Sequence, residues 1–172
     1  VALNRTNCVT GNCYSFDDVD DNINATTSVT RYPFTLEAWA KFDSGNAYDS
    51  VIHLSDADSA VIYYGIRRVE TSNIIQMDAR NPDQISTTSS TIAVTNNVWT
   101  HLTLVFNNET GRDLYINGAF NNYSNDNVTF ASGVDRTLIG LFRLTSPDDY
   151  MDGNIDNVRI YNKALTSAEI QD

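Results

Sequence analysis

Every second residue from 34 to 42 is apolar, and the residues between them are mostly polar. A period of two is that of a β-strand with one face in a protein core. The pattern predicts that the apolar set faces inward and that the other set faces outward. The inward set is Phe34, Leu36, Ala38, Ala40 and Phe42, and the outward set is Thr35, Glu37, Trp39 and Lys41.

Short strand-like runs recur along the rest of the chain, and helical periodicity is nearly absent. Segments rich in Ser, Thr, Asn and Asp separate the runs, and Asn117-Gly118 marks a hairpin turn. Thr166-Ser-Ala-Glu169 has the form of a capping box, which predicts one helical turn near the end. Many short strands favour an all-β antiparallel sandwich or barrel. Strands are expected near 49–54, 60–67, 72–79, 91–94, 99–106, 113–119, 127–130 and 136–142.

Length and charge limit the possible functions. A chain of 172 residues is expected to form one domain over 1–172. Its net charge of −11 argues against nucleic acid and against anionic membrane surfaces as partners. No apolar run approaches the length of a membrane span, so no direct membrane insertion is expected. The chain does not begin with Met, and we expect it to be tethered to other domains of a longer protein.

The two cysteines, Cys8 and Cys13, flank Gly11-Asn12, which is good turn chemistry. A short loop with a turn brings two thiols together, so a local disulfide is predicted. Two free thiols are the alternative. A disulfide would place the protein outside a reducing cytosol, secreted or at a cell surface.

The stretch 152–166 holds a carboxylate in an unusual place. Read as an uninterrupted strand, Asp156 shares a face with Val158 and Ile160. A carboxylate on an apolar face is costly unless a cation or a hydrogen-bond donor meets it. A bound metal and a structural hydrogen bond to a neighbouring loop are both open at this point.

Several blocks in one order resemble a laminin-G-like, concanavalin-A-like jelly-roll domain. The resemblance spans about residues 12–170, and the final block is the most specific. It implies two curved antiparallel sheets packed face to face, frequent calcium binding, and recognition of glycans or protein partners at cell surfaces. The blocks are Tyr14-Ser-Phe-Asp-Asp-Val-Asp-Asp, Phe34-Thr-Leu-Glu-Ala-Trp, Asn97-Val-Trp-Thr-His-Leu, Leu114-Tyr-Ile-Asn-Gly and Gly153-Asn-Ile-Asp-Asn-Val-Arg-Ile-Tyr-Asn-Lys-Ala-Leu.

The resemblance would bring the early acidic loop next to Asp156. Oxygen donors suit calcium, so Asp20 and Asp156 are the main predicted ligands, with Asp17 as a weaker one. The alternative is a solvated acidic loop. The family usually has Gly where this chain has Asp18. If that position requires φ > 0, Asp tolerates it at a cost.

A sugar-binding face would need exposed aromatic rings beside planar polar groups. Tyr64, Arg67, Asp78 and Arg80 lie on consecutive predicted strands and are the candidate ligand contacts. The alternative is that the tyrosines are half-buried residues of the sandwich.

Enzymatic chemistry is not expected. Glycosidases need a pair of carboxylates at a defined separation, and the glutamates here are scattered. We predict a non-catalytic, lectin-like adhesion or recognition module with calcium, whose partner is a glycan or a surface protein. The alternative is a purely structural module, such as a spacer or packing unit of a surface layer, filament or virion.

Overall fold

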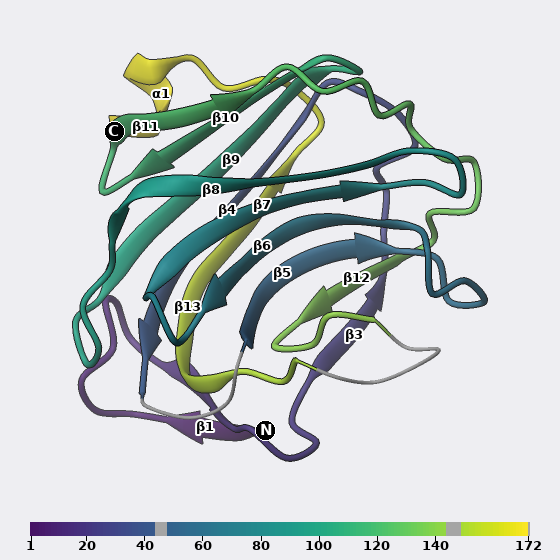
Figure 1. Cartoon of the computed structure of the whole chain (residues 1–172). Helices are drawn as coiled ribbons and strands as arrows, with labels where there is room; N and C mark the ends of the chain where they lie inside the picture. The colour runs from purple at the N-terminus through teal and green to yellow at the C-terminus, as the bar shows by residue number, and fades with distance from the viewer. Residues whose placement is uncertain (44–47, 144–148, 172) are drawn as a thin grey trace.

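The computed structural model describes residues 1–43, 48–143 and 149–171, and it forms two antiparallel sheets packed face to face (Figure 1). Sheet A has seven strands in the order β1-β2-β13-β4-β9-β10-β11, and sheet B has six in the order β3-β12-β5-β6-β7-β8. The strands are β1 Ala2–Asn4, β2 Cys13–Asp17, β3 Ile23–Thr26, β4 Phe34–Phe42, β5 Tyr48–Ser55, β6 Tyr63–Val69, β7 Ile74–Arg80, β8 Ile85–Ala93, β9 Thr100–Asn108, β10 Gly111–Ile116, β11 Ala119–Ser124, β12 Arg136–Ile139 and β13 Asp152–Tyr161.

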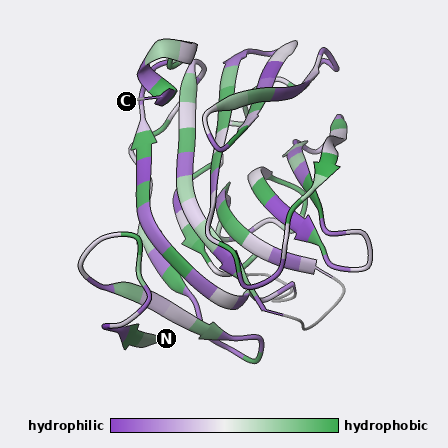
Figure 2. Ribbon diagram, turned by 90° about the vertical axis from the view of Figure 1, so that its left-hand side faces the viewer, coloured by the Kyte–Doolittle hydropathy of each residue, from purple (hydrophilic) through white to green (hydrophobic). Residues whose placement is uncertain are grey.

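The predicted all-β jelly-roll sandwich is confirmed. The core lies between the sheets, and all five residues of the predicted inward face of β4 are fully buried in it. Opposite them, sheet B contributes the apolar side chains Ile52, Leu54, Ile66 and Met77. Figure 2 shows the sandwich from the side, with hydrophilic and hydrophobic residues alternating along the strands.

The turn and cap predictions also hold. Asn117 and Gly118 both have positive φ, at 52° and 76°, and they connect β10 to β11. The helix α1 (Ser167–Gln171) begins after Thr166, whose hydroxyl accepts from the Glu169 amide at 3.3 Å. The Glu169 carboxylate accepts from the Thr166 amide at 2.9 Å in return.

The strand predicted at 127–130 does not form. Val128 is buried in the core, but the backbone around it bonds to turns and side chains instead of to a neighbouring strand. The Val128 amide donates to the Glu109 carbonyl at 2.9 Å, and the Val128 carbonyl accepts from the Tyr32 hydroxyl at 2.8 Å. Residues 127–130 therefore form an irregular segment that buries Val128, and the prediction of a strand there was wrong.

Strand β13 contains a bulge that overturns the predicted face of Asp156. From Asp156 to Arg159 the strand advances three residues, while its partner β4 advances two, from Trp39 to Glu37. Asn157 lies in this bulge and has a φ of 48°. The bulge reverses the alternation, so Asp156 lies on the outer face of sheet A, opposite to the side on which Ile160 packs against the core.

One buried ion pair joins several segments at one end of the sandwich. Arg68 and Asp49 are both fully buried, and Arg68 Nε donates to Asp49 Oδ2 at 2.7 Å. The Arg68 guanidinium also donates to the Asp43 carbonyl and to the side-chain oxygens of Asn73 and Asn96. Burial raises the pKa of Asp49 to about 6, although the Asp152 amide and Arg68 favour its charged form.

We expect Arg68→Leu to destabilise the fold by about 3–5 kcal/mol, because it leaves the Asp49 carboxylate buried without its cation. Urea unfolding followed by circular dichroism measures the loss. Arg5→Leu, which changes an exposed arginine, is the control and should have little effect. A loss below about 1 kcal/mol for Arg68→Leu would show that the pair is not needed.

Candidate functional site

The outer face of sheet B carries polar residues in three aligned rows. Residues opposite one another in the ladder share a face, so the register alone defines these rows. The rows across β5, β6 and β7 are Ser50, Arg67 and Gln76; His53, Gly65 and Asp78; and Ser55, Tyr63 and Arg80. Thr87 and Ser89 of β8 extend the rows beside Asp78 and Gln76. The structure thus brings together three of the predicted contacts, Arg67, Asp78 and Arg80.

Arg67 is held firmly at the centre of this face. Its Nε lies 2.7 Å from Asp78 Oδ2, an ion pair without the alignment of a good hydrogen bond, and its NH1 donates to Asp149 at 3.0 Å. The guanidinium carbon lies 4.5 Å from the ring centre of Tyr48 and 4.8 Å from that of Phe142. Arg67 therefore fixes the geometry of its neighbours and has little surface left for a ligand.

His53 lies beneath this layer and is completely buried. Gly65 provides the space for it, because a Cβ at that position would come within 2.4 Å of the imidazole ring. Burial lowers the pKa of His53, although the nearby Asp78 opposes this shift, so the imidazole is neutral at pH 7.

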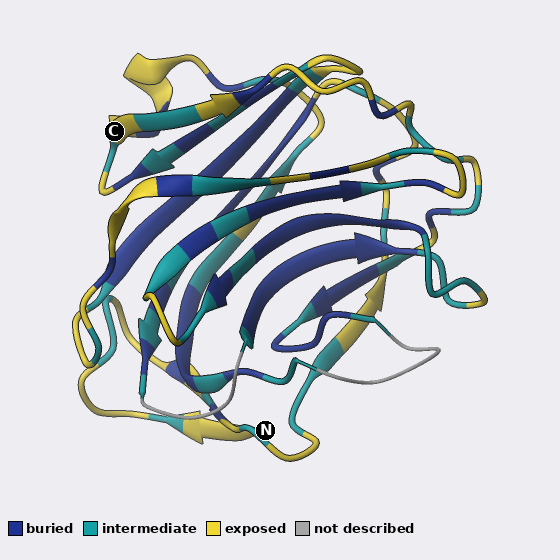
Figure 3. Ribbon diagram, viewed as in Figure 1, coloured by how far each residue is buried: buried dark blue, intermediate teal, exposed yellow. Residues whose placement is uncertain are grey.

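Several polar atoms of this face are buried but have no hydrogen-bond partner. They are Ser50 Oγ, both ring nitrogens of His53, Ser55 Oγ and Gln76 Oε1. The strands that hold them face the viewer in Figure 3, where β5 and β6 are dark blue along most of their length. An unsatisfied buried polar atom costs about 1–3 kcal/mol, so such a cluster is expected where a polar ligand or ordered water completes the bonding.

The accessible part of the face lies on β7 and β8. Arg80 and Gln76 are half-buried, and Thr87 is exposed. Among the described residues, no carboxylate forms an ion pair with Arg80, whose guanidinium carbon lies 6.0 Å from the ring centre of Tyr63. Tyr63 is only 4% exposed, because Phe142 packs against it at 4.6 Å. Arg80 is thus a cation that this face presents to solvent.

Tyr64, the predicted aromatic contact, is a core residue instead. It alternates with Tyr63 along β6 and points inward, where it is fully buried and stacks on Phe130 at 5.0 Å. Its hydroxyl donates to the Thr129 carbonyl and accepts from the Ala131 amide, both at 2.9 Å. It therefore has no ring surface available on the outer face of sheet B.

The sequence did not single out Ser50, His53, Ser55 or Gln76. The signal that finds them is the strand register, since each lies opposite a residue that was predicted or beside one. Strict alternation along β5 would have predicted which way His53 points. A shift in strand register between Ser50 and Ile52 interrupts that alternation.

The predicted disulfide between Cys8 and Cys13 is present. Its loop crosses the outer face of sheet A and supplies the partners of Asp156. Asp156 Oδ2 accepts from the amides of Val9 at 2.9 Å and Thr10 at 3.0 Å. Of the two explanations for this carboxylate, the geometry favours the structural hydrogen bond to a neighbouring loop.

Asp156 does not join the other predicted calcium ligands. In the β2–β13 ladder Asp17 pairs with Asp152, four residues along the strand from Asp156. At about 3.3 Å per residue, the backbones of Asp17 and Asp156 lie roughly 13 Å apart, too far for one ion. The separation follows from the strand register, which the resemblance alone did not give.

Asp17 and Asp20 do meet a third carboxylate, that of Asp21. Oxygen atoms of these three side chains lie within 4.8 Å of one another, a donor set that suits a hard cation. Asp18 lies between Asp17 and Asp20 and has a φ of 64°, as expected for a position where the family has Gly. The positive φ considered for this position is therefore present at Asp18.

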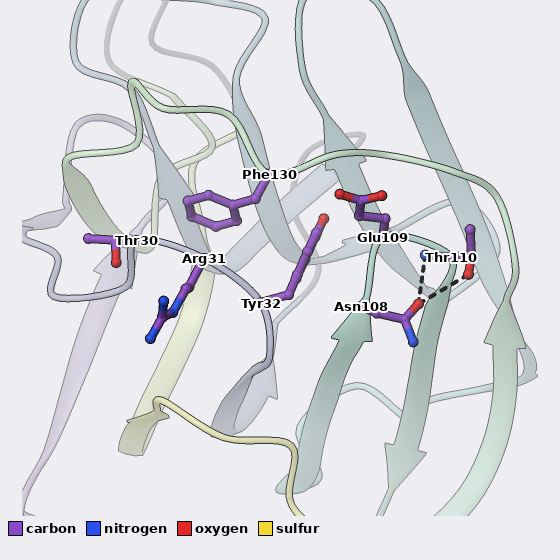
Figure 4. Close-up of a pocket in the computed structure, with 7 residues that line it drawn as sticks. All are labelled: Thr30, Arg31, Tyr32, Asn108, Glu109, Thr110 and Phe130. Carbon is purple, nitrogen blue, oxygen red and sulfur yellow. Dashed lines mark hydrogen bonds between the residues drawn. The ribbon is translucent and has the colours of Figure 1, made fainter.

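A separate hollow of about 610 Å³ lies at the end of the sandwich, between the β9–β10 hairpin and the segments around Tyr32 and Phe130 (Figure 4). Its aromatic rings pack on each other at 5.5 Å, and the Asn108 side chain accepts bonds from Thr110 in its own turn. It contains none of the predicted site residues.

The comparisons with known proteins agree with the architecture. A model of the concanavalin A-like lectin/glucanases superfamily matches residues 17–171. The chain belongs to this superfamily. A search of curated proteins finds no significant match.

Solved structures with the same fold include carbohydrate-binding modules. The CBM40 of Ruminococcus gnavus IT-sialidase, bound to α2,3-sialyllactose, superimposes with a TM-score of 0.74 at 16% identity, over 92% of this chain and 96% of that one. Domain 4 of AbnA, a GH43 extracellular arabinanase from Geobacillus stearothermophilus in complex with arabinotriose, gives 0.79 at 15% identity, over 99% and 80%. A mutant of NanB sialidase from Streptococcus pneumoniae gives 0.74 at 19% identity, over 92% of this chain but 27% of that one. At these identities the similarity establishes the fold.

We expect Asp156→Ala to lower stability by about 1–3 kcal/mol, because the amides of Val9 and Thr10 lose the buried carboxylate that accepts their hydrogen bonds. The loss should be the same in calcium and in chelator, since hydrogen bonds and not a metal hold this carboxylate. Thermal unfolding in both buffers tests this. A loss confined to the calcium buffer would restore Asp156 as a metal ligand.

Proposed function

We propose that this protein is a non-catalytic glycan-binding module whose ligand occupies the outer face of sheet B. The observation that supports the proposal is the group of buried, unpartnered polar atoms on β5 and β7. A glycan carries many hydroxyls, each both donor and acceptor, so it is suited to satisfy such a surface. The modules with the same fold that are bound to sialyllactose and arabinotriose add support.

The groups that reach the ligand are those on the open side of the face. Arg80 offers a planar set of donors to hydroxyl or carboxylate oxygens, and Gln76 offers an amide on the same strand, two rows away. Thr87 adds a hydroxyl, and it already donates to Asp78 Oδ1 at 3.0 Å. Arg67 and Asp78 act as positioning residues, because their mutual ion pair keeps the strands and the overlying aromatic rings in place.

We expect Arg80→Ala to weaken glycan binding at least tenfold, which is about 1.4 kcal/mol, without changing thermal stability. The measurement is binding to an immobilised panel that includes α2,3-sialyllactose, lactose and arabinotriose. Arg5→Ala is the matched control and should bind like the unmodified protein.

Two results would contradict this proposal. Unchanged glycan binding by Arg80→Ala would mean that the ligand does not bind on the outer face of sheet B. Absence of binding to every glycan of a broad panel would favour the structural alternative, in which the module acts as a spacer or packing unit.

We also propose that calcium binds at Asp17, Asp20 and Asp21. A metal that binds only the folded protein stabilises it by mass action. Chelator should therefore lower the melting temperature, and Asp20→Asn should remove the response while Asp156→Ala leaves it intact. Scanning calorimetry with and without calcium measures this effect. An identical melting temperature in calcium and in chelator would leave the cluster as a solvated acidic loop.

The Cys8–Cys13 disulfide supports an extracellular or surface location, since such bonds persist in oxidising compartments. No helix in the described parts of the chain has the length and apolar character needed to cross a membrane. We propose that the module works as part of a larger secreted or surface protein, where it holds the other domains near a glycan.

A further inference from the structure

A second groove, of about 800 Å³, lies on the outer face of sheet A, across the sandwich from the site described above. Its floor comes from the central strands β4, β9 and β13. The disulfide loop forms one wall through Val9 and Thr10, and α1 forms another through Ile170 and Gln171. The two motifs that the sequence singled out, the cysteine loop and the terminal helix, therefore both border this groove.

Both tryptophans of the chain line the groove. Trp39 is half-buried and stacks on His101 at 5.1 Å between ring centres. Trp99 is also half-buried, and its Nε1 donates to the Asn7 carbonyl at 2.7 Å, which fixes the indole against the disulfide loop. Two oriented aromatic rings in one depression provide apolar surface of the kind that packs against the flat faces of sugar rings.

A polar cluster lies beside the tryptophans. Glu37 Oε1 accepts from Arg159 NH1 at 2.7 Å, and His101 Nε2 lies 3.3 Å from the same oxygen. Burial opposes the charged form of Glu37, but the neighbouring His101 and Arg159 outweigh it and lower the pKa of this carboxyl. His101 is 8% exposed, and its Nε2 has no well-aligned hydrogen bond. A ring nitrogen with incomplete bonding therefore lies next to Glu37, on a residue that lines the groove.

The charges of the groove indicate the class of ligand. Arg159 is the single arginine of the lining and is already paired with Glu37, while Glu169 adds a second carboxylate. Glu169 is itself paired with Lys163, and the chain as a whole carries a net charge of −11. An anionic sugar would find no unpaired arginine or lysine among the residues that line the groove, whereas hydroxyls meet donors and acceptors at Asn117, Asn157 and Tyr161.

We propose that this groove is a second binding site, specific for a neutral oligosaccharide. Its aromatic floor packs against sugar rings, and Glu37, His101 and Arg159 bond to their hydroxyls. The site is independent of the face of sheet B, because the two lie on opposite sides of the core. A protein with both sites holds two glycans at once.

Intrinsic fluorescence tests this directly, because the two tryptophans lie in the groove and sheet B has none. The probes are arabinotriose, cellotriose and mannotriose, with α2,3-sialyllactose as the anionic comparison. We expect at least one neutral trisaccharide to shift the emission and to protect the indoles from quenching by acrylamide. Sialyllactose should leave both measurements unchanged.

Variants assign the signal to the groove. Trp99→Ala should weaken binding of the neutral trisaccharide at least tenfold in calorimetry. Arg159→Gln, which changes a side chain that is 54% exposed and so keeps the fold, should weaken it several-fold. Tyr123→Ala removes an exposed aromatic residue outside the groove and is the matched control. Arg80→Ala should leave this binding unchanged, which separates this site from the one on sheet B.

Three results would overturn the proposal. The first is that none of the neutral trisaccharides changes emission or quenching. The second is that a change occurs but survives in both Trp99→Ala and Arg159→Gln with full affinity. The third is that sialyllactose perturbs the tryptophans as strongly as the neutral probes do.

Discussion

The buried ion pair between Arg68 and Asp49 is the interaction on which the two-sheet arrangement most depends. Asp49 lies on β5 of sheet B, but its second oxygen accepts from the Asp152 amide at 2.8 Å, where β13 of sheet A begins. The Arg68 guanidinium meets the ends of three other segments in the same place. Because each partner would be left charged and desolvated without the other, the pair ties these segments into one geometry.

That geometry positions both surfaces that we consider functional. Arg68 and Arg67 are neighbours on β6 and point to opposite sides of sheet B. The ion pair of Arg68 in the interior therefore also fixes the position of Arg67 and its polar row on the outer face. On the other sheet, β13 is anchored at Asp152 and then carries its bulge, which turns Asp156 and Arg159 to the outer face. One anchor in the core thus sets the register of polar residues on both sides of the sandwich.

The outer faces differ in how their polar groups are arranged. On sheet B a cation, Arg80, lies over a layer of buried groups that lack partners. On sheet A the cation Arg159 is paired with Glu37, and two tryptophan rings line the groove. These differences in charge and aromatic content separate a face suited to hydroxyl or carboxylate oxygens from a groove suited to neutral rings.

The sequence by itself determined the fold class, the strict alternation of β4, the Asn117-Gly118 turn, the helix cap and the disulfide. Each of these depends on local chemistry, that is, on side-chain periodicity, backbone φ or short loop closure. It grouped Tyr64, Arg67, Asp78 and Arg80 as candidate ligand contacts, but the strand register puts only the last three on one face.

Only the tertiary structure decided which carboxylates meet and which aromatic rings are exposed. The bulge at Asn157 reversed the face of Asp156, and the β2–β13 register moved it away from Asp17. Tyr64 points into the core and Tyr63 to the outer side of sheet B, where Phe142 covers it, because successive residues of a strand point to opposite sides. Long-range pairing fixes such details, and no local pattern in the sequence encodes them.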